Sequence, residues 1–189
     1  QASNEQAITN AGRFIKEAGA QAVKLEGGAR MVPRIKALTN ADIPVMGHIG
    51  LTPQSINRMG GYKIQGKDNK EAIEIKQDAY QLQEAGVFSI VLEGVYEGLA
   101  AEITQSIKVP TIGIGAGIKC DGQILVLNDM LGLGNTTPKF VKQYTNLANE
   151  TKKAINQFIE EVREEIFPNL DHSYTIKTQQ VKSKTNRNK

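Results

Sequence analysis

The chain has 189 residues, of which 40% are hydrophobic and 23% charged, the composition of one ordinary globular domain. Its apolar runs are far shorter than the roughly 20 residues of a membrane span, and its single cysteine, Cys120, excludes an internal disulfide, so we expect a cytoplasmic protein that does not span a membrane. The net charge of +3 comes from residues 171–189, where five bases accompany one acid, which argues against a nucleic-acid partner.

The chain alternates helical and strand-like segments. Apolar residues at helical spacing precede Gly19, and a second set (Ala72, Ile75, Ala79, Leu82) precedes Gly86, so both glycines are predicted helix stops. Five short apolar runs predict strands at residues 22–25, 43–46, 89–92, 110–114 and 123–127. Continuously apolar strands between helices are typical of a parallel sheet that is covered on its outer face.

The C-terminal part has a different pattern. Thr137 and Pro138 are a plausible N-cap and first helical residue, so a long helix or helix pair is predicted after them. One apolar stripe runs along this region: Ile155, Phe158, Ile159, Val162 and Ile166. We interpret the stripe as core packing or a subunit contact, and not as a cofactor site.

An internal repeat favours a barrel among the possible α/β folds. Residues 17–28 align without a gap with residues 84–95, and each copy reads as a helix end, a turn, a strand and Glu-Gly. Glu26 and Glu93 would then close two strands that are separated by one. Alternate strands of a barrel contribute to the same interior layer, so both carboxylates should point toward one mouth.

Polar residues stand at the carboxyl ends of the predicted strands, where α/β barrels build their active sites. These residues are Lys24, Glu26, His48 and Glu93. Lys24 and Glu26 are two apart and share a strand face, where a buried lysine beside a carboxylate is costly unless it is paired or contacts a ligand. Other interpretations stay open: a structural Lys24–Glu26 ion pair, a loop hydrogen bond for His48, and a solvated turn at Glu93. Cys120 is predicted to be inert, because no Cys-His-acid set accompanies it.

Glycines provide a weaker signal. Gly113, Gly115 and Gly117 would share one face of a continued strand and leave room for backbone or ligand. They do not form a dinucleotide fingerprint, because the required spacing fails at Ile118. Residues 27–28 and 60–61 are predicted loop glycines near the same mouth.

Several motifs together resemble the ketopantoate hydroxymethyltransferase family: residues 48–55 (HIGLTPQS), 60–66 (GGYKIQG), 113–117 (GIGAG), 121–126 (DGQILV) and 138–140 (PKF). The resemblance extends from the first helix to about Tyr174. It implies a (β/α)8 TIM barrel of the phosphoenolpyruvate/pyruvate type, here from the third helix through strand 8 and the C-terminal helices. Residues 1–174 would form this partial barrel domain, and residues 175–189 a basic, disordered tail.

The resemblance also implies a reaction: transfer of a hydroxymethyl group from 5,10-methylenetetrahydrofolate to 3-methyl-2-oxobutanoate, giving ketopantoate for pantothenate and coenzyme A synthesis, with Mg²⁺ stabilising an enolate. By the same resemblance, Lys24 and His48 bind the substrate, Glu26 is associated with the metal, and Glu93 accepts the proton. The family assembles as a homodecamer or another large homo-oligomer.

In the family, two aspartates on the first strands hold the magnesium ion, and neither has a counterpart in this sequence. We therefore expect the chain to be a fragment of a longer enzyme and to be inactive alone. Two alternatives remain open. One is another Mg²⁺-dependent 2-oxo acid barrel of the isocitrate lyase kind, which would need a reactive cysteine in a mobile loop. The other is a non-catalytic polypeptide that keeps the fold for assembly, because unclosed sheet edges invite association.

Overall fold

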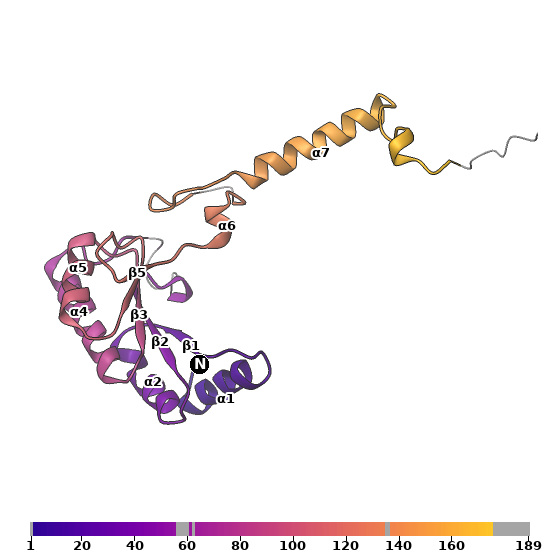
Figure 1. Cartoon of the computed structure of the whole chain (residues 1–189). Helices are drawn as coiled ribbons and strands as arrows, with labels where there is room; N and C mark the ends of the chain where they lie inside the picture. The colour runs from indigo at the N-terminus through magenta and orange to yellow at the C-terminus, as the bar shows by residue number, and fades with distance from the viewer. Residues whose placement is uncertain (1, 56–60, 62, 135–136, 176–189) are drawn as a thin grey trace, which may run out of the picture.

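The computed structural model describes residues 2–55, 61, 63–134 and 137–175 (Figure 1). Five strands form one sheet in the order β1-β2-β3-β4-β5, and every neighbouring pair is parallel. The strands are β1 (Val23–Glu26), β2 (Val45–Gly50), β3 (Ser89–Glu93), β4 (Thr111–Ile114) and β5 (Gly122–Gln123). The predicted α/β class and parallel sheet are confirmed. Within the described residues the sheet has two free edges, so the closed barrel stays a prediction.

Three helices join β1 to β4 in sequence order, β4 leads to β5 without one, and the described residues form six α-helices in all. They are α1 (Asn4–Lys16), α2 (Val32–Thr39), α4 (Asn69–Glu84), α5 (Glu97–Ser106), α6 (Leu127–Met130) and α7 (Leu147–Arg163). Single 3-10 turns occur at Ala29–Met31, Pro53–Ser55 and Leu170–His172. Both predicted helix stops are confirmed, since Gly19 and Gly86 follow α1 and α4 with φ of 68° and 93°. Each connecting helix returns the chain to the end of the sheet where the previous strand began, so the next strand can pair in parallel with it.

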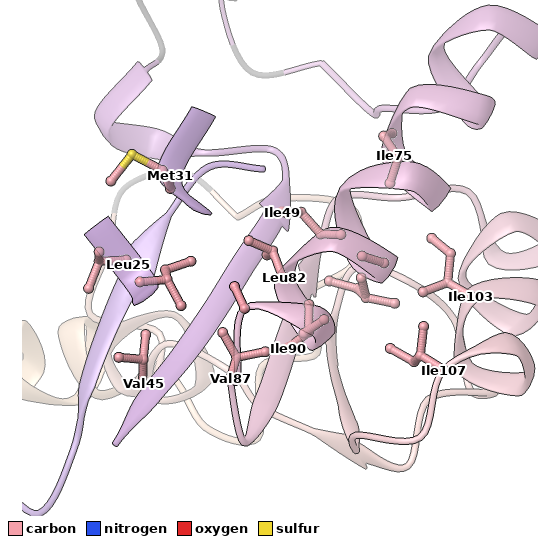
Figure 2. Packing of buried hydrophobic residues seen from close by; sticks show 14 of the residues in the cluster. Leu25, Met31, Val45, Ile49, Ile75, Leu82, Val87, Ile90, Ile103 and Ile107 are labelled. Carbon is pink, nitrogen blue, oxygen red and sulfur yellow. The ribbon is translucent and has the colours of Figure 1, made fainter. Parts of the chain in front are cut away.

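The core lies between one face of the sheet and helices α2, α4 and α5 (Figure 2). Alternate strand residues point into it: Leu25, Val45, Ile49, Ile90 and Leu92. Helix residues such as Leu38, Leu82 and Ile103 meet them and are fully buried. Because side chains alternate along a strand, the residues between these point to the opposite, inner face. The outer core thus fixes which side chains gather on the inner face.

The fifth predicted strand is shorter than expected. Residues 123–127 were predicted as a strand, but β5 ends at Gln123 and a helix begins at Leu127. β5 is an edge strand with β4 on one side only: the Ile124 amide still donates to the Gly113 carbonyl at 3.0 Å, but Ile124, Val126 and Leu127 have exposed side chains. Apolar composition alone predicted more strand than the described partners can pair.

The start of the long helix was also predicted wrongly. Thr137 and Pro138 lie in an irregular segment, and α7 begins at Leu147, where the Asn146 side chain accepts the Asn149 amide at 3.1 Å. The amides of Tyr144 and Leu147 donate to carbonyls of α6 and the residue after it, which holds the segment before α7 in an extended course. Asn146, and not Thr137, is therefore the N-cap of the long helix.

Helix α7 extends away from the sheet (Figure 1). Its stripe residues Ile155, Phe158, Ile159 and Val162 are 38–53% exposed, and Ile166 lies beyond its end. Core packing of this stripe within the described chain is therefore wrong, and a subunit contact stays a prediction. The basic residues of the tail after Thr175 lie outside the described residues. Among the described residues, no helix is both long and apolar enough to cross a bilayer.

A buried polar network joins β4 to the turn before β5. Thr111 is fully buried, and its amide and hydroxyl donate to Asp121 Oδ2 at 2.8 and 3.2 Å. Its hydroxyl also lies 2.8 Å from the hydroxyl of Thr104 on α5. The network satisfies polar groups that burial would otherwise penalise, so it holds the end of the sheet together.

Replacing Thr111 by Val should lower the free energy of unfolding by about 0.5–1.5 kcal/mol, because the methyl group removes the hydrogen bonds of the Thr111 hydroxyl, while Thr104 keeps the Ala100 carbonyl and the exposed Asp121 keeps the Thr111 amide. Urea unfolding followed by circular dichroism measures this. The control is Thr151→Val on the exposed face of α7, which should change stability little. Equal stability of the two variants would mean that the network does not stabilise the fold.

Candidate functional site

Three polar residues converge on the inner face at the carboxyl ends of β1, β2 and β3. In the sheet register Glu26 lies beside His48, and Glu93 lies beside Gly50 at the end of β3. His48 Nδ1 is 3.7 Å from Glu26 Oε1, and His48 Nε2 is 3.1 Å from Glu93 Oε2. The predicted meeting of the two repeat-related carboxylates at one mouth is thereby confirmed, with the imidazole of His48 between them.

The imidazole is enclosed while the carboxylates are partly open. The side chain of His48 is 1% exposed, against 11% for Glu26 and 16% for Glu93. The 3.1 Å between His48 Nε2 and Glu93 Oε2 is a hydrogen-bond length, but the oxygen lies off the N–H direction. Neither ring nitrogen therefore has a hydrogen-bond partner among the described residues. The interpretation of His48 as a loop-binding residue is therefore not supported; its ring faces the two glutamates.

Backbone contacts fix the ends of these strands. The amide of Gly27 donates to the carbonyl of His48 at 2.8 Å, and Glu26 Oε2 accepts the amide of Gln54 at 3.0 Å. Glu26 is thus tied to both the strand beside it and the turn that follows β2. Sequence reasoning missed Gln54, because a main-chain amide that serves a distant carboxylate leaves no residue signature.

Gly50 lets β2 and β3 approach at this point. It has φ of 89°, and a Cβ atom there would clash with the carbonyl oxygen of Glu93. The next amide, of Leu51, donates to that same carbonyl at 2.7 Å. A glycine directly after an apolar strand was the available signal, although the sequence alone did not show which partner required it.

Lys24 shares the inner face with Glu26 but is exposed, which contradicts the expected buried lysine. β1 is an edge strand, so its inner face is open on one side. Within the described chain Lys24 makes no ion pair with Glu26, and the structural ion pair is therefore wrong. Lys24 instead lines a hollow of about 230 Å³ with Gln54 and Asn10. Among the described residues its ammonium group makes no ion pair.

The glycine run does not leave a ligand space. β4 ends at Ile114, and Gly115 and Gly117 follow with φ of 65° and 81°, so the three glycines do not share a strand face. The ring of Phe140 fills the position of a Gly115 side chain, with Cδ1 2.7 Å from the Cβ site.

Burial raises the pKa of the Cys120 thiol, which supports the prediction that Cys120 is inert.

Glu26 is the right kind of ligand for Mg²⁺, which prefers carboxylate and water oxygens. Its two oxygens, however, face the His48 ring and the Gln54 amide. In the part of the chain that the structure describes, no three His, Cys, Asp or Glu side chains gather into a metal-binding group. These residues alone do not make a magnesium site.

Comparisons with known proteins agree on one family. Residues 1–170 match the family described as ketopantoate hydroxymethyltransferase. A 3-methyl-2-oxobutanoate hydroxymethyltransferase of Carboxydothermus hydrogenoformans is 56% identical over 93% of this chain and 64% of its own length. The enzyme of the same name from Clostridium acetobutylicum is 57% identical over 93% of this chain and 64% of its own length. The chain thus spans less than two thirds of these relatives.

A solved structure gives a weaker likeness. A putative lyase/mutase from Burkholderia cenocepacia J2315 matches with a TM-score of 0.45 and 16% identity. The match covers 89% of this chain and 59% of that protein. This likeness is too low to support any statement about fold or activity.

Replacing Gly50 by Ala should destabilise the chain by about 1–3 kcal/mol, because the left-handed backbone and the Glu93 carbonyl both exclude a side chain. The matched control is Gly12→Ala in helix α1, where nothing lies within 4 Å of the Cβ site. That change should stabilise the chain by about 0.5–1 kcal/mol, because alanine favours helix. Urea unfolding of both variants compares them, and a Gly50→Ala variant as stable as the parent would contradict the clash.

Proposed function

Because the chain belongs to the ketopantoate hydroxymethyltransferase family, we propose that it serves the transfer of a hydroxymethyl group from 5,10-methylenetetrahydrofolate to 3-methyl-2-oxobutanoate, giving ketopantoate. The observation that carries the proposal is the convergence of Glu26, His48 and Glu93 at the carboxyl ends of adjacent strands. The relatives named for this activity are longer than the matched region, so the activity belongs to the longer family architecture. We propose that this architecture is the closed (β/α)8 barrel, with residues 1–174 as one part of it.

Glu93 is proposed as the base. Its carboxylate is mostly buried yet 16% exposed, so it is accessible to a substrate from the mouth. It would remove the proton from C3 of the 2-oxo acid, whose conjugate base is delocalised into the adjacent ketone. Water would first release the one-carbon unit from its two folate C–N bonds as formaldehyde, leaving tetrahydrofolate. The C3 carbanion then attacks the formaldehyde carbon, forming the new C–C bond, and the formaldehyde oxygen takes the proton held by Glu93 to become the hydroxyl group. A positioned base contributes about 10²- to 10⁴-fold to such a rate.

Lys24 and His48 are proposed on the substrate-binding side of the site. Lys24 is an exposed cation on the same face as Glu26, and a compact ammonium is suited to the carboxylate of a 2-oxo acid. His48 lies beneath the two glutamates at the same mouth. When bound, Mg²⁺ would take Glu26 as one ligand, with others from outside the described residues, and would polarise the ketone.

Assembly and location complete the proposal. The exposed apolar stripe on α7 supports assembly into a homodecamer or another large homo-oligomer, since burying such a stripe removes apolar surface from water. We propose a cytoplasmic location, in agreement with a single, half-buried cysteine. The partners are then a 2-oxo acid and a folate.

Replacing Glu93 by Gln should slow exchange of the C3 proton of 3-methyl-2-oxobutanoate with deuterated water by about 10²- to 10⁴-fold, because the amide cannot accept the proton. The assay uses a complemented chain, defined as this chain fused to the segment of the Clostridium acetobutylicum relative that it does not match. Loss of the C3 proton signal in NMR gives the rate. The exposed Glu84→Gln variant is the control and should exchange normally; an unchanged rate in Glu93→Gln would remove Glu93 as the base.

Replacing Lys24 by Met should weaken binding of the 2-oxo acid to the complemented chain by about tenfold, the effect of losing roughly 1.4 kcal/mol of charge pairing. Folate affinity should stay unchanged, because the proposed contact is to the carboxylate of the keto acid. Isothermal titration calorimetry measures both affinities. The control is Lys16→Met on α1, which removes an equal charge at a position away from the site. If the two variants bind the 2-oxo acid with the same affinity, the proposed carboxylate contact is wrong.

A further inference from the structure

We infer that His48 is a positioning residue that sets the geometry of two glutamates at once, orienting Glu26 through Nδ1 and Glu93 through Nε2. The inference rests on the proposed function, since it concerns the base and the metal-associated carboxylate of that site. It assigns His48 a different role from direct substrate contact.

The first support is that the His48 side chain is less exposed than the two glutamate side chains. The His48 side chain is 1% exposed, and the glutamates above it are 11% and 16% exposed. A substrate that enters from the mouth therefore meets the carboxylates before it can meet the imidazole. His48 acts on the chemistry only through the groups that it touches.

The second support is the position of the ring in the sheet. His48 pairs with Glu26 across β1 and β2, whereas its partner on β3 is Val91, two residues before Glu93. One ring nitrogen therefore faces sideways to Glu26 and the other faces diagonally upward to Glu93. The two nitrogens of an imidazole point in different directions, so a ring that carries a proton on each nitrogen can donate to both carboxylates.

The third support is that the strand carrying the ring is held in place, while the ring nitrogens have no other partner among the described residues. The carbonyl of His48 accepts the Gly27 amide, and the preceding Gly47 sits against Leu82 on the core side. Among the described residues neither ring nitrogen has a hydrogen-bond partner, which is costly for buried polar atoms. Small rotations of the glutamate side chains, which are the less enclosed partners, bring an oxygen into line with a ring N–H.

A fixed imidazole that donates from both nitrogens would also hold the two carboxylates near each other against their mutual repulsion. Glu26 and Glu93 each lie within 3.7 Å of the same ring, so both would occupy one small region of the mouth. Without a common partner, two like charges favour rotamers that separate them. His48 thus keeps the base pointing into the site.

The test uses asparagine and glutamine, because their amide nitrogens occupy the positions of Nδ1 and Nε2 respectively. In the chain itself, labelled with ¹³C at the glutamate carboxyl carbons, His48→Asn should shift the Glu93 signal and leave that of Glu26. His48→Gln should do the reverse, and His48→Leu should shift both. His172→Asn, which changes the only other histidine of the sequence, should shift neither. Equal effects of the Asn and Gln variants on both signals would overturn the inference.

A second arm measures proton exchange at C3 in the complemented chain. His48→Gln should keep the rate within about tenfold of the parent, and His48→Asn should lose more than tenfold at saturating substrate while its affinity changes little. If all three variants instead lose affinity with an unchanged saturated rate, His48 contacts the substrate directly and the inference fails. If the parent itself shows no exchange, the proposed function fails, whereas the carboxyl spectra still decide whether His48 orients both glutamates.

Discussion

The site depends on the close approach of β2 and β3 at Gly50. Because this residue has no side chain, the carbonyl of Glu93 can lie against it and accept the amide of Leu51 at 2.7 Å. That contact sets the end of β3 relative to β2, and it carries Glu93 to within 3.1 Å of the His48 ring. A backbone requirement at one position therefore determines the spacing of two side chains of the candidate site.

The two faces of the sheet have different roles, one in the core and one in the candidate site. Residues such as Leu25, Ile49 and Leu92 bury the outer face under helices and supply the stability of the domain. The residues that alternate with them, Glu26 and His48 among them, are turned to the inner face, where charge is tolerated because the mouth is open. The apolar pattern of the strands thus specifies the location of the polar cluster.

Much of this arrangement could be predicted from the sequence. The repeat placed Glu26 and Glu93 at equivalent strand ends, and strand alternation put Lys24 on the face of Glu26; both follow from local periodicity. The failures have a common cause, which is dependence on partners far along the chain. The strand expected at residues 123–127 required a neighbour beside β5, and the helix expected from Thr137 lost to the contacts of Tyr144 and Leu147 with the α6 region. The exposure of Lys24 likewise reflects the edge position of β1, which no local pattern reports.

The edge position of β1 has a consequence for how the site is built. β1 carries Glu26, and its outer side has a row of main-chain donors and acceptors without a neighbouring strand in the described residues. Any strand that pairs there would also wall in the space beside Lys24 and Glu26. Sheet growth and enclosure of Lys24 and Glu26 would then be a single cooperative event, so that the space beside them becomes dry and ordered only when the architecture is whole.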